Sequence, residues 1–337
     1  YNKVSRDFLM EQLTPLELGS STGAMMNNVG KVKNTGVEIS LSTVNVQTKN
    51  FYWSTTFSFA KNKNEILELN GGKEDLIANK WFIGQPIDVI YDYEYAGVCT
   101  AEEAKAYATN DAIKTKFIEG EMKLKDQQQP GEEGYGIIDE NDLVVLGHAL
   151  PKWTGSVTSN MTYKNFDFSF SIYTKQGGMV ESPFMAEFTN YKDRGRNKLK
   201  MDYYIPAGTP VLNADGSGYT LTTEAHMGAY PYPTNTANNN YGGGIGWGTD
   251  KQTTYVGNSY VNNSFVKIKN ITLGYTFPKS WMSKIGVDHL RLYVNVLNPF
   301  TFTSYKGFDP EWAEAALNDG TGGPSSRTYQ VGVNLKF

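Results

Sequence analysis

The chain has 337 residues, of which 13% are aromatic and only 20% are charged, and its formal net charge is -4. This charge balance offers no basic surface, so nucleic acid is excluded as a partner. The single cysteine, Cys99, excludes an internal disulfide framework. Mean hydropathy is -0.45, and no apolar run approaches the roughly 18 residues of a membrane-spanning helix. A membrane barrel stays open, because alternating strands average to neutral hydropathy.

Apolar and polar residues alternate along several segments, as is typical of strands with two different faces. The alternation is clearest in residues 51–60, 166–175 and 328–337. Weaker alternation marks residues 37–42, 157–163, 265–277 and 290–296, and residues 1–10 resemble a truncated strand. The phase slips near Lys269, which predicts a β-bulge there. Together these segments predict about eight strands.

The connections between these segments alternate in length. Residues 48–50, 164–165 and 277–288 are predicted short turns. The predicted long connections are residues 11–35, 62–150, 178–262 and 303–327. Inside the second of these, residues 100–125 are expected to be helical behind a capping box of Thr100 and Glu103. Outer-membrane barrels have short periplasmic turns and long external loops, so the pattern favours such a barrel over a soluble sandwich or solenoid.

The two chain ends add to this interpretation. The last strand ends in Phe337, a terminal aromatic of the kind common in outer-membrane barrels, which predicts a periplasmic C-terminus and outward-facing long loops. The chain begins at Tyr1 without a Met or a signal peptide, which we interpret as a piece of a longer precursor. A chain trimmed at its start has the same appearance.

Five stretches resemble the SusC-like (SusC/RagA) class of TonB-dependent outer-membrane transporters. They are residues 27–38, 59–66, 163–169, 264–275 and 298–311, of which the last two resemble the class most. The resemblance implies an all-β fold, a transmembrane antiparallel barrel of about 22 strands closed around a plug. Residues 1–337 are then the C-terminal portion, with about eight strands, and the plug and the remaining strands lie upstream.

The resemblance also implies a function and partners. The function is import of oligosaccharides across the outer membrane of a Gram-negative, Bacteroidetes-like cell. Its partners are the N-terminal portion of the same transporter, a SusD-like lipoprotein over the loops, TonB acting through the upstream region, and the lipid bilayer. Import of peptides is the alternative within the class. A secreted, glycan-binding adhesin is the alternative outside it.

Catalytic and metal chemistry are not expected. His148, His226 and His289 lack partners at metal-ligand spacing, and no nucleophile elbow or phosphate loop is present. No enzyme activity and no cofactor are therefore predicted. Members of the class often carry an acidic loop, of which residues 138–142 and 146–147 remain here while residues 131–136 replace its acidic first half. Asp139, Asn141 and Asp142 are the possible metal ligands that are left. Hard cations such as Ca²⁺ need six or more oxygen ligands, so a solvated turn is favoured over a calcium site.

Aromatic residues of the long connections are the candidates for substrate binding, because sugar C–H faces stack on Tyr and Trp. The substrate-binding candidates are Trp81, Tyr91, Tyr93, Tyr191, Arg194, Tyr203, Tyr230, Trp247 and Trp312. A wider set adds Tyr95, Phe188, Arg196, Tyr204 and Tyr232. The alternative role for each is packing of the loops against one another or against a partner.

Overall fold

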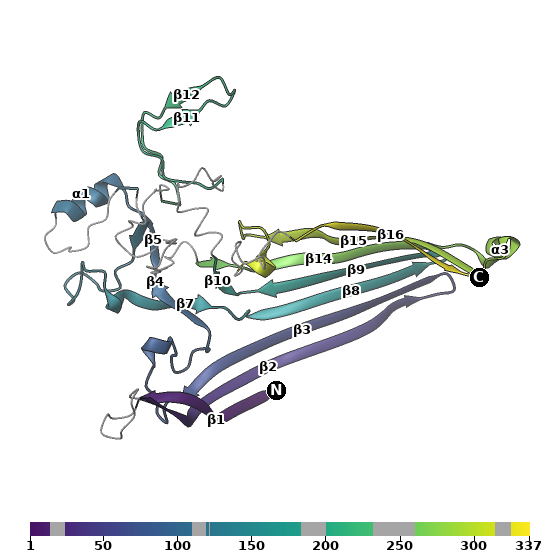
Figure 1. Cartoon of the computed structure of the whole chain (residues 1–337), viewed down its shortest axis with the longest axis horizontal. Coiled ribbons are helices and arrows are strands. Elements are labelled where there is room, and N and C mark those ends of the chain that lie inside the picture. Colours follow the sequence, from purple (N-terminus) through teal and green to yellow (C-terminus); the bar gives the residue numbers. More distant parts are fainter. Residues whose placement is uncertain (14–23, 110–118, 121, 183–199, 232–259, 314–324) are drawn as a thin grey trace.

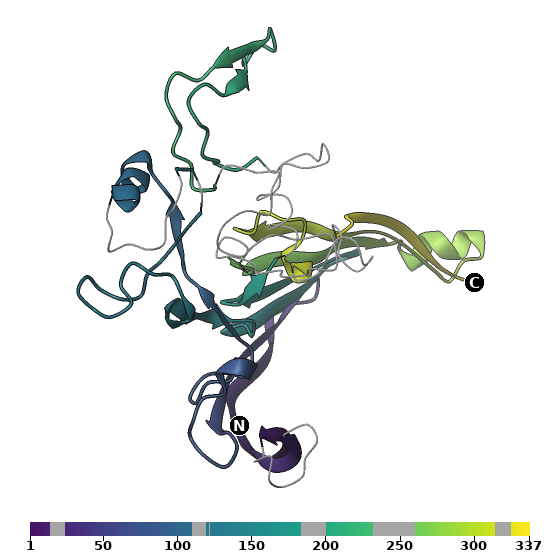
Figure 2. The same ribbon diagram turned by 60° about the vertical axis from the view of Figure 1, so that its left-hand side comes forward.

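The computed structural model describes residues 1–13, 24–109, 119–120, 122–182, 200–231, 260–313 and 325–337. Its main feature is one eight-stranded sheet in the order β1-β2-β3-β8-β9-β14-β15-β16, with every neighbouring pair antiparallel. The strands are β1 (Asn2–Leu13), β2 (Ala24–Gln47), β3 (Phe51–Glu68), β8 (Trp153–Tyr163), β9 (Phe166–Gln176), β14 (Phe265–Thr276), β15 (His289–Thr303) and β16 (Thr328–Lys336). Because sheet order follows chain order, the sheet is a meander, and the prediction of about eight strands is confirmed. Figure 2 shows it as a curved wall running from β1 to β16.

The short turns gather at one end of the sheet. Thr48 N–H donates to Phe51 O at 2.8 Å in the β2–β3 turn, and Lys164 takes a φ of 52° between β8 and β9. The β14–β15 connection holds the helical turns α3 (Lys279–Met282) and η5 (Ser283–Ile285). These turns lie beside the C-terminus, whereas the long connections lie at the opposite end (Figure 1). The predicted alternation of short and long connections is confirmed.

Register locks the sheet into two chemically different faces. Residues directly opposite on neighbouring strands share a face, so one row can be followed from β3 to β16. One such row is Trp53, Met161, Phe168, Leu273, Val294 and Val331. The adjacent row, on the other face, is Ser54, Asn160, Ser169, Thr272, Asn295 and Gln330. The predicted alternation therefore adds up across strands to an apolar outer face and a polar inner face.

The outer face stays exposed although it is apolar. Leu273 is 51% exposed, Val294 47% and Val331 80%. Aromatic pairs sit near both edges of this face. They are Phe51–Tyr163 and Phe166–Tyr275 near the turns, and Phe59–Trp153 and Phe300–Phe302 towards the long connections. Aliphatic side chains and further aromatic ones, such as Phe57 and Phe168, fill the band between them. We call this band and its aromatic edges the apolar belt.

The predicted bulge in β14 is confirmed. Both ladders of β14 shift register between Ile268 and Asn270: Lys269 is the extra residue against β9, and two β15 residues, Asn298 and Pro299, lie opposite it. A bulge of this kind restores the phase, so Ile268 and Ile271 both stay in the outer face. This accounts for the slip in the sequence pattern.

Two predicted connections are too long. Strand β1 reaches Leu13, β2 begins at Ala24, and β3 continues to Glu68, where residues 11–35 and 62–150 were expected to be loops. The polar stretch 61–65 of β3 has no apolar face, so alternation gave no signal there. The helix prediction is also too long: α1 (Ala101–Thr109) covers its first part, but residues 122–124 at its far end form a strand. Its capping box is confirmed by Glu103 N–H to Thr100 Oγ1 at 3.1 Å and Thr100 N–H to Glu103 Oε2 at 3.0 Å.

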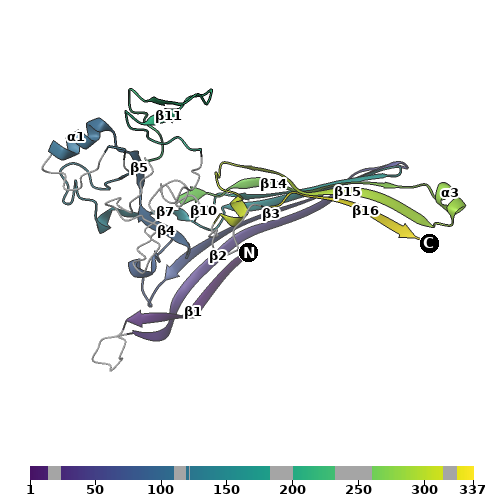
Figure 3. The same ribbon diagram turned by 45° about the horizontal axis from the view of Figure 1, so that its top comes forward.

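The long connections fold into small paired elements. These are β4 (Val89–Tyr93) with β7 (Leu143–His148), β5 (Tyr95–Val98) with β6 (Met122–Leu124), β10 (Met179–Glu181) with β13 (Tyr260–Asn262), and β11 (Pro210–Leu212) with β12 (Tyr219–Leu221). Short 3-10 turns add η2 (Ile77–Asn79), η3 (Glu140–Asp142) and η6 (Pro310–Trp312). Figure 3 shows them clustered beyond the loop end of the sheet. In the described part of the chain, no helix has the length and apolar character needed to cross a membrane.

Candidate functional site

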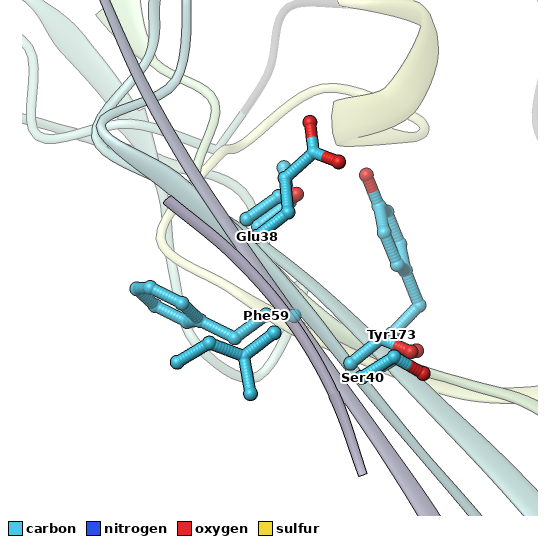
Figure 4. Close-up of a pocket in the computed structure, with 10 residues that line it drawn as sticks. Glu38, Ser40, Phe59 and Tyr173 are labelled. Carbon is cyan, nitrogen blue, oxygen red and sulfur yellow. The ribbon is translucent and has the colours of Figure 1, made fainter. Parts of the chain in front are cut away.

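The inner face carries a groove between β2 and β9. Its volume is about 410 Å³, and small side chains such as Ser40, Ser58 and Ser156 form its floor. Glu38 and Tyr173 rise on the same side as Ser40, while Phe59 points to the other side of the sheet (Figure 4). Small hydroxyl-bearing side chains therefore line the inner face here, whereas the opposite face is apolar.

A buried charge network borders this groove. Lys267 of β14 has a fully buried side chain, and its Nζ donates to Asp309 Oδ2 at 2.7 Å and to Glu311 Oε2 at 2.5 Å. Lys269 Nζ donates to Glu311 Oε1 at 2.5 Å, and the Ser325 hydroxyl donates to Asp309. We call these five residues the Lys267 cluster. It fixes the segment after β15, including η6, against the inner face.

The two carboxylates of the cluster are held in their ionised form. Burial raises the pKa of Asp309, but hydrogen bonds from Lys267 and Ser325 outweigh it and leave the pKa below its usual range. Burial likewise raises the pKa of Glu311, and Lys267 and Lys269 reverse the shift. A lowered carboxylate pKa stabilises the fold above about pH 4, and that contribution is lost as pH falls through the lowered values. The cluster is therefore fully formed at neutral pH.

A second ion pair crosses the inner face near the turns. Arg291 Nη2 lies 2.5 Å from Asp167 Oδ2, and the pair spans β14 because Asp167 is on β9 and Arg291 on β15. Gly274 lies beneath them, and a Cβ there would collide with the Asp167 carboxylate. The absence of a side chain at Gly274 thus leaves the room that the ion pair needs. The guanidinium also lies 4.9 Å from the ring centre of Tyr293.

Three tyrosines from two long connections meet beyond the loop end of the sheet. The Tyr95 hydroxyl donates to Ala229 O at 2.8 Å, and the rings of Tyr203 and Tyr230 are 6.1 Å apart in an edge-to-face arrangement. Burial raises the pKa of Tyr203 to about 12, with a further contribution from Tyr230. Burial raises the pKa of Tyr95 as well, again with help from Tyr230. We call Tyr95, Tyr203 and Tyr230 the tyrosine cluster.

Backbone hydrogen bonds hold the tyrosine cluster in place. Tyr204 N–H donates to Tyr230 O at 2.7 Å, and Tyr230 N–H donates to Asp202 O at 3.0 Å. The Asp202 carboxylate pairs with His226 Nε2 at 2.7 Å, and this hydrogen bond holds the pKa of Asp202 below its usual range. Tyr230 also packs against a buried group of Val180, Tyr305 and Ala313. The cluster is thereby connected to the segment that the Lys267 cluster holds.

The structure separates the predicted substrate residues into several places. Tyr203 and Tyr230 come together, and Trp312 is 55% exposed beside the Lys267 cluster. Trp81 packs on the buried group Val32, Ile66 and Leu69. The ring centres of Tyr91 and Phe82 are 4.7 Å apart. Tyr93 packs on the buried group Cys99, Met122 and Leu124. These last three form packing contacts of the loops. Tyr191, Arg194 and Trp247 lie outside the described residues.

The acidic turn has structural hydrogen bonds. Asp139 Oδ1 accepts from Asn141 N–H at 2.8 Å, and Asp142 Oδ2 accepts from Asp139 N–H at 2.8 Å. Asp142 is fully buried, and its Oδ1 accepts from Gln127 N–H at 2.7 Å. These contacts describe a capped 3-10 turn. Within the described ranges, no group of three or more His, Cys, Asp or Glu residues is arranged to hold a metal ion.

Sequence reasoning missed the two inner-face ion pairs. Lys267 and Asp309 both fall in stretches that resemble the SusC-like class. Neither residue could be singled out from the sequence, because each has other polar or charged residues nearby. Their sequence separation of 42 residues hides the contact. The one available signal was a lysine within an otherwise apolar strand segment, because buried lysines require a partner.

Comparison with known proteins relates the chain to a family. No family model matches the chain. TonB-dependent receptor P3 of Formosa agariphila is 29% identical over 352 residues, which cover 96% of this chain and 30% of that protein. TonB-dependent receptor SusC of Bacteroides thetaiotaomicron is 27% identical, over 96% of this chain and 28% of that protein. The chain is a homologue of the TonB-dependent receptors. Its predicted resemblance to the SusC-like class is confirmed.

Solved structures share the fold of this receptor homologue. A chain of the RagAB peptide transporter matches it with a TM-score of 0.63 and 22% sequence identity, covering 100% of this chain and 32% of that one. At this identity the likeness concerns the fold alone, so the eight-stranded sheet corresponds in fold to part of that chain. The chain spans about a third of the length of the relatives it matches.

Proposed function

We propose that this chain is the C-terminal part of the wall of an outer-membrane, TonB-dependent importer of oligosaccharides. One observation supports this most: register gathers the apolar side chains of eight strands on one exposed face and the polar ones on the other. Such a two-faced wall, with short turns at one end and long connections at the other, is what a membrane barrel requires. The relationship to TonB-dependent receptors supports the transport role.

The dimensions of the apolar belt fit a bilayer. On β3 it runs from Phe51 to about residue 60, so it spans about ten residues at roughly 3.3 Å each. A strand tilt of about 40° turns this length into a height of roughly 25 Å, the height of the apolar band of outer-membrane barrels. The lipid bilayer is therefore the partner of the outer face. The turn end of the sheet, with Phe337, then faces the periplasm.

The two edge strands call for further protein. Among the described residues, strands β1 and β16 each have a neighbour on one side only, and an unpaired strand edge in lipid is very costly. The N-terminal portion of the same transporter, with its plug, supplies the missing strands in this proposal. TonB acts on that portion, and a SusD-like lipoprotein covers the long connections.

The chemistry of the passage favours a neutral, polar, oligomeric substrate. The tyrosine cluster and exposed Trp312 offer aromatic faces for sugar rings, and the groove floor offers hydroxyl groups. A peptide is the second candidate, because the matching RagAB structure is described as a peptide transporter. Aromatic and hydroxyl groups also bind peptides, so competition between the two substrate classes has to distinguish them.

Substitution of Tyr203 tests the substrate role of the tyrosine cluster. In the intact transporter, Tyr203→Ala is expected to raise the half-saturation concentration for oligosaccharide uptake about tenfold, equivalent to about 1.4 kcal/mol. Tyr203→Phe keeps the ring and is expected to stay within about twofold of the parent. Uptake of labelled oligosaccharide by whole cells, normalised to surface abundance, measures both.

Tyr219→Ala is the matched control, because Tyr219 lies on β12 and is 73% exposed. It is expected to leave uptake unchanged. If unlabelled peptides but not oligosaccharides compete for uptake, the peptide alternative replaces the present proposal. If Tyr203→Ala takes up substrate like the parent, the tyrosine cluster has no role in binding.

A further inference from the structure

A notch interrupts the sheet wall between β3 and β8. The β3–β8 ladder ends at the pair Ala60 and Thr154. Pairing on this side of β3 resumes at Ile66, whose N–H donates to Gln85 O at 2.9 Å. Between these points lies a pocket of about 280 Å³. Its lining comes from residues 61–64 of β3, residues 84–86, and residues 148 and 150–152 before β8.

The lining of this notch is basic. Lys61, Lys63 and Lys152 all contribute to it, together with His148. Among the described residues, Lys61 and Lys152 have no ion-pair partner. Lys63 has only a solvent-exposed contact with Glu65 at 3.3 Å, which is worth little. One oxygen of the nearby Asp88 carboxylate, Oδ2, accepts from the Leu150 N–H at 2.6 Å, and none of these lysines pairs with this carboxylate. The pocket thus offers ammonium groups that are free to bind an anion.

Register gives the depth of the two β3 lysines. Phe57, Phe59, Lys61 and Lys63 alternate on one face of β3, and Phe57 lies opposite outward-facing Val157 of β8. Lys61 follows the last aromatic residue of the belt by two positions, or about 7 Å. Phe59 and Trp153, whose ring centres are 5.8 Å apart, lie directly below. The lysines therefore stand on the lipid side, at the edge of the belt that faces the long connections.

We propose that Lys61 and Lys63, at the outer side of this notch, bind the phosphate group of an outer-leaflet lipid headgroup. The inference rests on the proposed function, which puts this edge of the belt in the outer leaflet. An ammonium group at this level is within reach of headgroup phosphates, and each basic residue near such a surface adds about 1 kcal/mol. The Phe59–Trp153 pair below favours a lipid over free phosphate, because it offers apolar contact for an acyl chain.

Lipid binding to the intact transporter tests this site. The probe is diphosphorylated lipid A, added at increasing fractions to phosphatidylcholine nanodiscs that hold the transporter, with occupancy counted by native mass spectrometry. The double variant Lys61→Gln/Lys63→Gln is expected to bind about 25-fold more weakly, or about fivefold for each lysine. The matched control is Lys49→Gln/Lys164→Gln, which removes two lysines at the turn end of the same strands and is expected to bind like the parent.

Two further arms distinguish the source of the phosphate. Removing the phosphates from lipid A is expected to weaken its binding to the parent protein about as much as the double substitution does. The same removal is expected to leave its binding to the double variant unchanged. Inorganic phosphate at millimolar concentration is expected to compete weakly. The inference is overturned if the double variant binds lipid A like the parent, or if inorganic phosphate alone saturates the site. Substrate uptake is measured separately. A variant that loses lipid binding but keeps normal uptake shows that the lipid site can be lost without loss of transport.

Discussion

Replacing Lys267 with methionine is expected to destabilise the barrel by about 3–5 kcal/mol, because Asp309 would keep a buried charge without a cation and Glu311 would keep only Lys269. The Asp309 side chain is only 3% exposed, so water cannot replace the lysine there. Methionine has a similar length and preserves most of the packing, which isolates the loss of charge. The expected readout is a lower midpoint for unfolding of the intact protein in denaturant, at neutral pH.

Lys279→Met is the matched control for this prediction. Lys279 pairs with Asp288 at 3.0 Å but is 80% exposed, so its removal is expected to change stability by less than about 1 kcal/mol. A second variant combines Lys267→Met with Asp309→Leu and Glu311→Gln, and is expected to recover much of the loss because no buried charge is left without a partner. Lys269 loses Glu311 in this variant, but its side chain is 35% exposed. Equal stability of Lys267→Met and the parent would mean that the buried network contributes nothing.

An arginine in the middle of the apolar belt is expected to have the second large effect. Leu41 is 55% exposed and lies in the outward row with Phe57, Val157 and Ile172. Leu41→Arg is expected to cost about 2–4 kcal/mol, the range for Arg or Lys near the midplane of a membrane barrel. The measurement is the fraction of intact transporter that assembles in the outer membrane, followed by its unfolding midpoint in lipid.

Ser42→Arg is the control on the neighbouring residue. Ser42 points to the inner face, where its hydroxyl lies 3.1 Å from Thr56 Oγ1. An arginine there remains in water, so assembly is expected to stay within about 1 kcal/mol of the parent. If Ser42→Arg were the more damaging substitution, the assignment of the two faces would be inverted.

The strands were predictable from sequence wherever the two faces differ in chemistry. Residues 166–175 alternate phenylalanine with serine, and this segment forms β9 almost to the residue. The bulge at Lys269 was predictable for the same reason, since one inserted residue shifts the alternation between two apolar runs by one position. The sequence pattern failed in residues 24–35 and 61–68, where β2 and β3 continue past the apolar belt. The polar run 61–65 has no apolar face and residues 24–35 show no sustained alternation, so periodicity carries no information there.

The candidate site was predictable only in part. Listing loop aromatics found Tyr203 and Tyr230, which meet, but it also included Trp81 and Tyr93, which pack inside the loops. Composition cannot distinguish a packed aromatic from an exposed one, because both are surrounded by polar sequence. The Lys267 cluster could not be predicted, since it joins β14 to a segment that follows the next strand.

The central claim is that one face of this sheet meets lipid and the other meets water. Spin labels placed singly at residues 37–42 of β2 in the intact transporter, with Cys99→Ser as background, test it most directly. Accessibility to oxygen, which concentrates in lipid, is predicted to peak at Val37, Ile39 and Leu41. Accessibility to a water-soluble nickel chelate is predicted to peak at Glu38, Ser40 and Ser42. Equal access of the nickel chelate to both sets of positions would contradict the account.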